Sequence, residues 1–260
     1  MPRTLLFVAG LLVACVMGAV PHAAADGKTG IVVMHGKDGS AKPGSPIGGL
    51  VNYLGDDFLV EAPNMPWSRR NALNRTLEES FAEIDQAVAR LKSLGADKIV
   101  VGGHSMGAAA ALAYATERSG LAGVVLMAPG HRPDVWSGKN RHFLSNAREL
   151  VAAGKSKETV DIYDKNQGKL FTRRVAAEVA VSWFDPDGLA VMQNAAAKLP
   201  EGTPVLIIIG EDDGFRPKVE GEVFDKLPAH PKNAFLVIGG GHKQTPEKGK
   251  SEIAAWLNGL

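Results

Sequence analysis

Short, almost continuous apolar runs alternate along the chain with segments of helical periodicity. Six such runs are found, at residues 30–34, 57–60, 98–101, 122–127, 204–209 and 234–238. Runs of this kind are typical of strands that are buried on both faces of a parallel sheet. Because helical segments separate them, the pattern predicts an α/β fold with a doubly wound, mostly parallel sheet of about six strands.

The clearest helix is predicted over residues 76–94. Thr76 and Glu79 form a capping-box pair at its start, and Gly95 ends it. Its apolar positions recur at spacings of three and four and share one face: Leu77, Phe81, Ile84, Val88 and Leu91. Other helical patterns cover 106–116, 218–227 and a C-terminal segment with Ile253, Trp256 and Leu257 on one face.

One long stretch, residues 131–200, interrupts the alternation. It shows no clear strand pattern, whereas 143–153, 173–184 and 188–198 have helical character. A helical insertion that caps a site and an ordinary crossover with extra helices fit this length equally well. We therefore expect one domain over residues 26–260 that carries a helical insertion at about 131–200.

The first 25 residues have the features of a secretory signal peptide. Arg3 supplies a positive start, residues 5–20 are apolar, and an Ala-x-Ala cleavage site ends at Ala25. Cleavage would place the mature chain in the periplasm or outside the cell, without stable membrane insertion. An uncleaved anchor and a lipidated Cys15 are the alternatives. The second is disfavoured because apolar residues continue beyond Cys15.

Composition and charge exclude several classes of function. The 29 basic and 28 acidic residues give a net charge of +1, which is no electrostatic signature of nucleic-acid binding. Cys15 is the only cysteine, so the cleaved chain would have no thiol nucleophile, disulfide or cysteine metal site. The glycines at 239–241 do not open a helix as a dinucleotide fingerprint would. We expect neither a cofactor nor a metal.

Gly103-His104-Ser105-Met106-Gly107 matches the pattern G-x-S-x-G. The bare pattern is weak evidence, and a glycine-rich turn without chemistry is the alternative. Its context strengthens it, because the motif follows the apolar run at 98–101 and opens an alanine-rich helix. A strand-to-helix elbow of this kind raises the serine Oγ above the sheet edge, beside the amides of a helix N-terminus. Ser105 is therefore the predicted nucleophile.

In this context the motif resembles the nucleophile elbow of the α/β-hydrolase superfamily of esterases and lipases. That superfamily places an acid and then a histidine after the serine along the chain. The run at 204–209 is followed by Gly210-Glu211-Asp212-Asp213. The resemblance assigns the acid to Asp213, three residues after the glycine, with Asp212 as the competitor.

The resemblance also assigns the general base. His242 follows the run at 234–238 on a glycine-rich loop, which is where the superfamily carries its histidine. It would accept the Ser105 proton and later protonate the leaving group, while Asp213 holds its tautomer and orientation. His22, His131, His142 and His230 do not directly follow a strand end in the right order, and His104 lies inside the elbow, where it is expected to pack or to bond to backbone.

The first apolar run ends in His35-Gly36-Lys37, which resembles the superfamily's His-Gly oxyanion segment. The resemblance implies an oxyanion hole made by the backbone N–H groups of Met106 and Lys37. His35 would then brace the loop. Metal binding by His35 is disfavoured because no second ligand lies at a useful spacing. After cleavage at Ala25, the few residues before residue 30 leave no room for the superfamily's first two strands, so a compact member is expected.

The substrate pocket is less well determined. Trp67, Trp183 and Phe184 are candidates for lining an apolar acyl or alcohol pocket. Arg69 and Arg70 either hold a substrate carboxylate or belong to a solvated loop.

The expected reaction is cleavage of a small carboxylic ester through an acyl-enzyme on Ser105. An aromatic content of only 6% argues against a broad lipid-facing surface, and hence against a lipase. A peptidase, amidase or thioesterase on the same triad remains an alternative, because the fold does not decide the leaving group. A non-catalytic binding protein is disfavoured, because all three triad residues are present.

Overall fold

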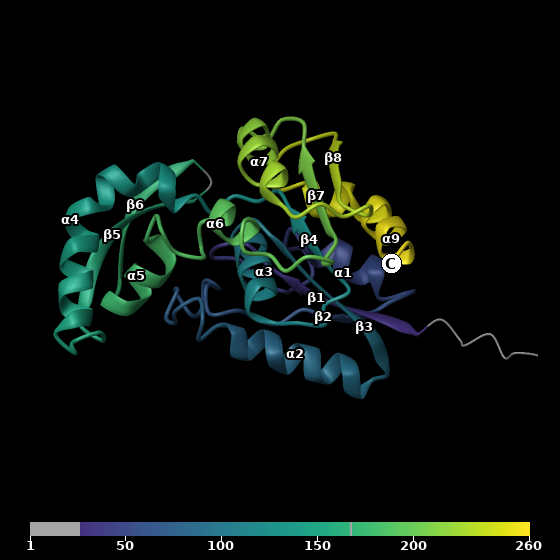
Figure 1. Cartoon of the computed structure of the whole chain (residues 1–260), viewed down its shortest axis with the longest axis horizontal. Coiled ribbons are helices and arrows are strands. Elements are labelled where there is room, and N and C mark those ends of the chain that lie inside the picture. Colours follow the sequence, from purple (N-terminus) through teal and green to yellow (C-terminus); the bar gives the residue numbers. More distant parts are fainter. Residues whose placement is uncertain (1–26, 167) are drawn as a thin grey trace, which may run out of the picture.

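The computed structural model describes residues 27–166 and 168–260. The predicted signal peptide lies outside the described residues and stays a prediction. A six-stranded parallel sheet of order β2-β1-β3-β4-β7-β8 forms the centre of the molecule (Figure 1). The strands are β1 (Lys28–Met34), β2 (Leu59–Glu61), β3 (Ala96–His104), β4 (Gly123–Met127), β7 (Val205–Gly210) and β8 (Ala234–Ile238). The predicted fold class and number of strands in the sheet are confirmed.

Helices cover both faces of this sheet. One face packs against α2 (Phe81–Ser93), α3 (Met106–Glu117), α6 (Met192–Ala196) and α7 (Arg216–Glu222). The other packs against α1 (Gly48–Leu54) and α9 (Lys250–Asn258). The 3₁₀ helix η1 (Phe224–Lys226) follows α7, and α8 (Thr245–Lys248) precedes α9.

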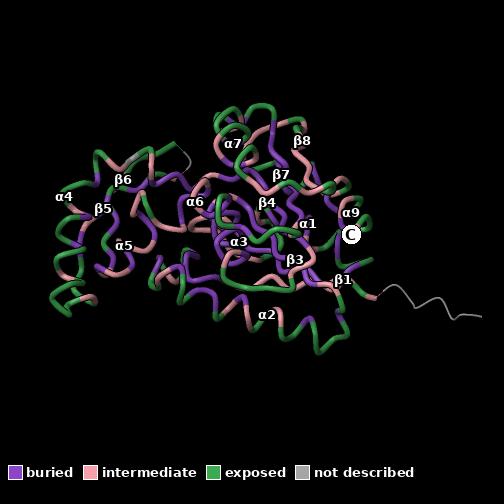
Figure 2. The backbone as a smooth tube through the Cα atoms, viewed as in Figure 1, coloured by how far each residue is buried: buried purple, intermediate pink, exposed green. Residues whose placement is uncertain are grey.

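Alternation along each strand divides the core into two apolar clusters. Val32 and Met34 of β1 belong to the α3 side, and Ile31 and Val33 to the α1 side. Helix α3 is buried over its first ten residues, Met106–Ala115, in the centre of Figure 2. Because its alanine side chains are small, this helix can pack closely against the sheet on one side and against other helices on its remaining sides.

The predicted capping box forms ahead of α2. The Thr76 N–H donates to Glu79 Oε2 at 2.9 Å, and the Glu79 N–H donates to Thr76 Oγ1 at 3.0 Å. The α-helix itself begins at Phe81, after a tight turn that includes these residues. Each side chain thus satisfies a backbone donor that the helix leaves without a carbonyl.

The insertion is not purely helical, which corrects the sequence prediction. It contains α4 (Pro133–Ala152), the antiparallel strands β5 (Thr159–Asn166) and β6 (Lys169–Ala176), and α5 (Ala177–Phe184). In Figure 1 these elements form a lobe beside the central sheet. Val160 and Ile162 are buried while Asp161 and Tyr163 alternate with them on the outer side, so only one face of the hairpin is apolar. A search for continuous apolar runs misses such strands. Residues 173–176, which were predicted to be helical, belong to strand β6.

Within the described part of the chain, no helix combines the length and apolar character needed to cross a membrane.

Candidate active site

Ser105 lies at the sharp turn between β3 and α3. Its backbone has φ 57° and ψ −115°, a region that non-glycine residues rarely occupy. The Ser105 N–H donates to the Met127 carbonyl at 3.0 Å, which fixes the turn to β4. A β-carbon on Gly103 would lie 2.2 Å from the backbone carbonyl of Gly107, so only glycine allows this close approach of strand and helix. A strained serine held in this way is typical of a functional site.

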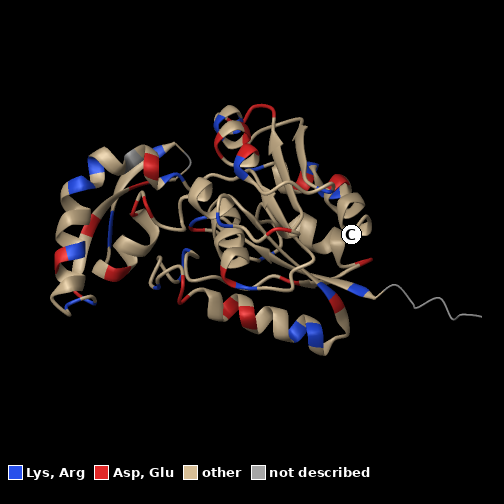
Figure 3. Cartoon of the chain, viewed as in Figure 1, with Lys and Arg blue, Asp and Glu red and all other residues tan. Residues whose placement is uncertain are grey.

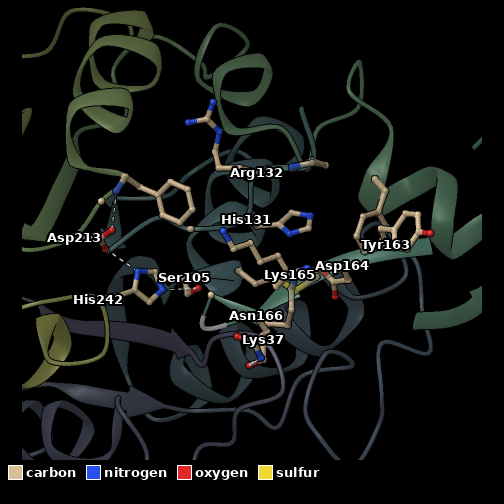
Figure 4. Close-up of a pocket in the computed structure, with 17 residues that line it drawn as sticks. Lys37, Ser105, His131, Arg132, Tyr163, Asp164, Lys165, Asn166, Asp213 and His242 are labelled. Carbon is tan, nitrogen blue, oxygen red and sulfur yellow. Dashed lines mark hydrogen bonds and ion pairs between the residues drawn. The ribbon is translucent and has the colours of Figure 1, made fainter. Parts of the chain in front are cut away.

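Ser105, His242 and Asp213 form one hydrogen-bonded series. His242 Nε2 lies 3.0 Å from Ser105 Oγ, and His242 Nδ1 lies 2.7 Å from Asp213 Oδ2. Figure 4 shows the imidazole between the hydroxyl and the carboxylate. The three residues come from loops that follow β3, β7 and β8, whose carboxyl ends meet at one edge of the parallel sheet. This arrangement can move a proton from the serine hydroxyl to the imidazole.

Asp213, rather than Asp212, makes the contact with His242. The Asp213 side chain is 2% exposed, and its second oxygen, Oδ1, accepts the Phe215 N–H at 3.0 Å. Burial raises the pKa of this carboxyl, but hydrogen bonds from His242 and Phe215 outweigh it and hold the pKa below its usual value. The carboxyl is therefore an ionised, acceptor-only group. Asp212 is exposed, and its backbone N–H bonds to Gly240.

Two further histidines support the site from behind. His104 is buried, and its Nε2 donates to the backbone carbonyl of His242 at 2.9 Å. His35 Nε2 accepts the Met65 N–H at 3.1 Å, which places its proton on Nδ1, 2.8 Å from the Gly36 carbonyl. His35 therefore braces the loop after β1, in the arrangement expected from the sequence.

Met106 and Lys37, the predicted oxyanion donors, both border the cavity that contains Ser105. Met106 is the first residue of α3, so its N–H has no carbonyl to bond within the helix. Lys37 lies on the loop after β1 and, like Ser105, borders both the cavity and a small hollow beside it. The structure thus brings both predicted residues to the cavity of Ser105 from different elements, and their role as oxyanion donors stays a prediction.

The cavity has a volume of about 440 Å³, and the insertion forms much of its wall. A β-carbon on Gly130 would lie 3.0 Å from Ser105 Oγ, so this glycine keeps the space above the nucleophile open. Figure 4 shows Tyr163, Asp164 and Lys165 across the cavity from His242 and Asp213. The lining residues that the sequence interpretation did not single out include Pro133, Tyr163, Asp164, Lys165, Asn166 and Phe215.

Of the three predicted pocket aromatics, only Phe184 lines the cavity. Trp67 and Trp183 have no exposed surface and pack edge to face with ring centroids 5.4 Å apart. Their indole N–H groups bond inward, Trp67 to the His35 carbonyl at 2.7 Å and Trp183 to the Arg75 carbonyl at 3.0 Å. The prediction that these two residues line the pocket is wrong, because both belong to the core between sheet and insertion.

Four charged residues join the oxyanion loop to the insertion, and we call them the charge cluster: Lys37, Asp38, Asp164 and Arg173. Lys37 Nζ pairs with Asp164 Oδ1, and Arg173 Nε lies 2.9 Å from Asp164 Oδ2. Arg173 also reaches Asp38 Oδ2 at 3.0 Å, and Asp38 has a positive φ of 52°. Burial lowers the pKa of Lys37 even though Asp164 opposes the shift. The cluster was not foreseen because its members lie on segments far apart in the sequence.

Two buried histidines predict acid sensitivity of the fold. Burial, together with the nearby His242, lowers the pKa of His104 from 6.5 to about 3, and burial beside Lys37 lowers that of His131 to about 4. The unfolded chain takes up these protons near pH 6.5 while the folded chain does not. The free energy of unfolding therefore falls as pH falls from about 6.5 to about 4, by at most about 1.4 kcal/mol per unit for each histidine.

Urea unfolding at pH 7, 6 and 5 measures this slope. His131→Gln is expected to flatten it, whereas His142→Gln, an exposed position on α4, should retain the wild-type slope. Equal slopes for His131→Gln and the wild type would contradict the assignment.

Among the described residues, no group of three or more His, Cys, Asp or Glu side chains is arranged to hold a metal ion.

Comparison with known proteins agrees with this fold. The model of the Alpha/beta hydrolase family matches residues 31–249, most of the described chain. A search of curated proteins finds no matching relative.

Several solved structures share the fold over nearly their whole length. One is a carboxyl esterase from Bacillus coagulans, at 16% identity and TM-score 0.66, with 91% of each chain covered. Another is one of the metagenome-derived lipolytic enzymes LipS and LipT, at 18% identity and TM-score 0.60, covering 90% of this chain and 95% of that one. A thioesterase domain from the curacin biosynthetic pathway follows at 16% identity and TM-score 0.56, covering 90% and 92%. At these identities the likeness shows the fold alone.

Proposed function

Because the chain belongs to the α/β-hydrolase family, we propose that it is a serine hydrolase that cleaves small carboxylic esters through an acyl-enzyme on Ser105. The observation that carries the proposal is the hydrogen-bonded series from Ser105 Oγ through His242 to the buried Asp213 carboxylate. Proteins with esterase and lipolytic names share this fold, which supports a hydrolase but not a particular ester.

In the first step, His242 Nε2 takes the Ser105 proton while Oγ attacks the ester carbonyl carbon. The ionised Asp213 stabilises the imidazolium that forms. The backbone N–H groups of Met106 and Lys37 receive the negative charge that develops on the carbonyl oxygen. The imidazolium then protonates the departing alcohol, which leaves an acyl group on Ser105. A water molecule, deprotonated by His242, attacks the acyl carbon and releases the acid and the free serine.

The cavity favours a small substrate. Its volume of about 440 Å³ is near the lower end of ligand pockets, and charged and polar side chains border it beside Phe184 and Phe215. A long acyl chain would need a longer apolar wall. Amide and thioester substrates fit the same triad and are the second candidates, since a thioesterase domain shares the fold. We also propose that residues 1–25 direct export to the periplasm or the medium.

The test compares p-nitrophenyl acetate, butyrate and palmitate as substrates, with a fluorophosphonate probe on the same samples. We expect turnover of the short esters and labelling of the wild type, neither of which occurs in Ser105→Ala. Ser145→Ala, an exposed serine on α4, is the matched control and should behave as the wild type. Probe labelling without ester turnover would discard simple esters, and a paired amide and thioester would then be assayed. Absence of labelling would overturn the serine hydrolase proposal.

A further inference from the structure

A second and larger depression lies next to the cavity, and we call it the basic groove. It has a volume of about 1660 Å³ and runs between the loops that follow β1, β2 and β8. Five cationic residues that do not belong to the charge cluster line the groove: Lys42, Arg69, Arg70, Lys243 and Lys248. They come from three segments of the chain, so their proximity is a product of the fold.

These five cations are not neutralised by the protein. All are exposed, and within the described residues none of them forms an ion pair. Two carboxylates line the groove, and each is bound to another cation. Asp38 pairs with Arg173 at 3.0 Å, and Glu247 pairs with Lys250 at 2.6 Å. The groove therefore carries a local excess of positive charge.

This excess is not a consequence of a basic protein. The whole chain has a net charge of only +1, and Figure 3 shows both signs on the insertion, on α2 and on α7. Five like charges around one depression repel one another, which an anionic ligand would relieve. Polar side chains that also line the groove include Asn52, Asn64, Ser68 and Gln244, so it suits a hydrated anionic group better than an acyl chain.

The groove adjoins the catalytic cavity. Lys37 and Asn166 line both. A small hollow of about 50 Å³ shares Ser105 with the cavity and Gly39 and Pro46 with the groove. A molecule with its scissile carbonyl at Ser105 would thus reach the groove with a part several bonds away.

We infer that the substrate carries an anionic group, a carboxylate or a phosphate, which binds in the basic groove while the ester lies at Ser105. The inference rests on the proposed function and narrows its substrate class. Arginine offers a planar pair of donors to either anion, and lysine adds positive charge at less defined geometry. Binding of this kind acts at a distance from the reacting bond, so it aligns the substrate on the nucleophile.

Two matched substrate pairs test the inference. In the first, p-nitrophenyl hydrogen suberate is compared with its methyl ester, which differs only in the terminal carboxylate on the acyl side. In the second, S-butyryl-4′-phosphopantetheine is compared with the neutral S-butyryl-pantetheine, which lacks only the phosphate on the leaving-group side. We expect kcat/KM of the anionic member to exceed that of the neutral one about tenfold in at least one pair. The preference should shrink as salt is added.

Charge variants locate the effect. The triple variant Arg69→Gln, Arg70→Gln, Lys243→Gln is expected to bring the ratio of anionic to neutral kcat/KM close to one. The control triple Lys92→Gln, Lys198→Gln, Lys226→Gln removes the same charge from exposed positions that do not line the groove, and it should keep the wild-type ratio. The pair that shows the preference identifies carboxylate or phosphate as the anion.

Failure of the inference and failure of the proposed function give different results. Turnover of the neutral members with ratios near one in both pairs overturns the inference alone. A preference that the groove triple leaves unchanged overturns it as well. No turnover of any substrate, together with no fluorophosphonate labelling, overturns the proposed function and the inference with it.

Discussion

Asp213→Asn is expected to lower kcat for p-nitrophenyl acetate by about 10⁴-fold while the protein stays folded. The reason lies in the two contacts of this carboxylate. Oδ1 accepts the Phe215 N–H at 3.0 Å and Oδ2 accepts from His242 at 2.7 Å. Asparagine has a single acceptor oxygen, which the Phe215 N–H would take. Its NH₂ group would then face His242 Nδ1 and place the imidazole proton on Nε2, so the nitrogen beside Ser105 could no longer accept a proton.

Asp212→Asn is the matched control for this experiment. It makes the same chemical change one residue away, at an exposed position without a side-chain contact to His242. We expect the kcat of Asp212→Asn to lie within about twofold of the wild type, because this replacement removes only a solvated charge. A loss of activity in Asp212→Asn with full activity in Asp213→Asn would exchange the roles of the two acids.

Asp164→Asn is expected to lower the free energy of unfolding by about 3–5 kcal/mol at pH 7, because it leaves a buried cation without its partner. Asp164 is 2% exposed and pairs with both Lys37 and Arg173. Its negative charge also raises the pKa of Lys37. Without it, the Lys37 ammonium gives up its proton at lower pH, so the difference from the wild type should narrow as pH rises. Denaturant unfolding at pH 7 and pH 9 measures both effects.

The same hairpin supplies the control. Asp161 pairs with Arg174 at 2.8 Å, but these side chains are 36% and 71% exposed. Solvent-exposed pairs of this kind contribute about 0–1 kcal/mol, so Asp161→Asn should be nearly neutral. If both variants are equally stable, the charge cluster does not anchor the hairpin. If kcat falls in Asp164→Asn alone while the fold survives, the cluster also positions the Lys37 backbone.

The sheet and the triad could be predicted because each left a local signal. Six apolar runs became the six parallel strands, and the residues after three of them supplied Ser105, Asp213 and His242. In parallel sheets the position of a residue after a strand already determines the edge at which it lies. The catalytic acid could be narrowed only to Asp212 and Asp213, because the conformation of the loop decides which of two adjacent carboxylates faces the imidazole.

The insertion and the pocket could not be predicted for physical reasons. Strands β5 and β6 are apolar on one face only, and tertiary contacts decide which face is buried. Trp67 and Trp183 have the character of pocket aromatics and of core aromatics alike, and only packing separates the two. The charge cluster and the basic groove both unite segments that are distant in sequence, and neither pattern is visible along the chain.

The triad residues and the facing wall of the cavity come from different parts of the fold, and this has a consequence for laboratory evolution. Ser105, Asp213 and His242 are spread over more than half of the chain, whereas much of the facing wall of the cavity comes from one short stretch, residues 163–166 with Gly168. Because side chains alternate along a strand, Lys165 can be varied while Asp164 and Asn166 keep their contacts with the β1 loop. A single mutagenic cassette would then sample new selectivities in a library whose members all retain the same reactive centre.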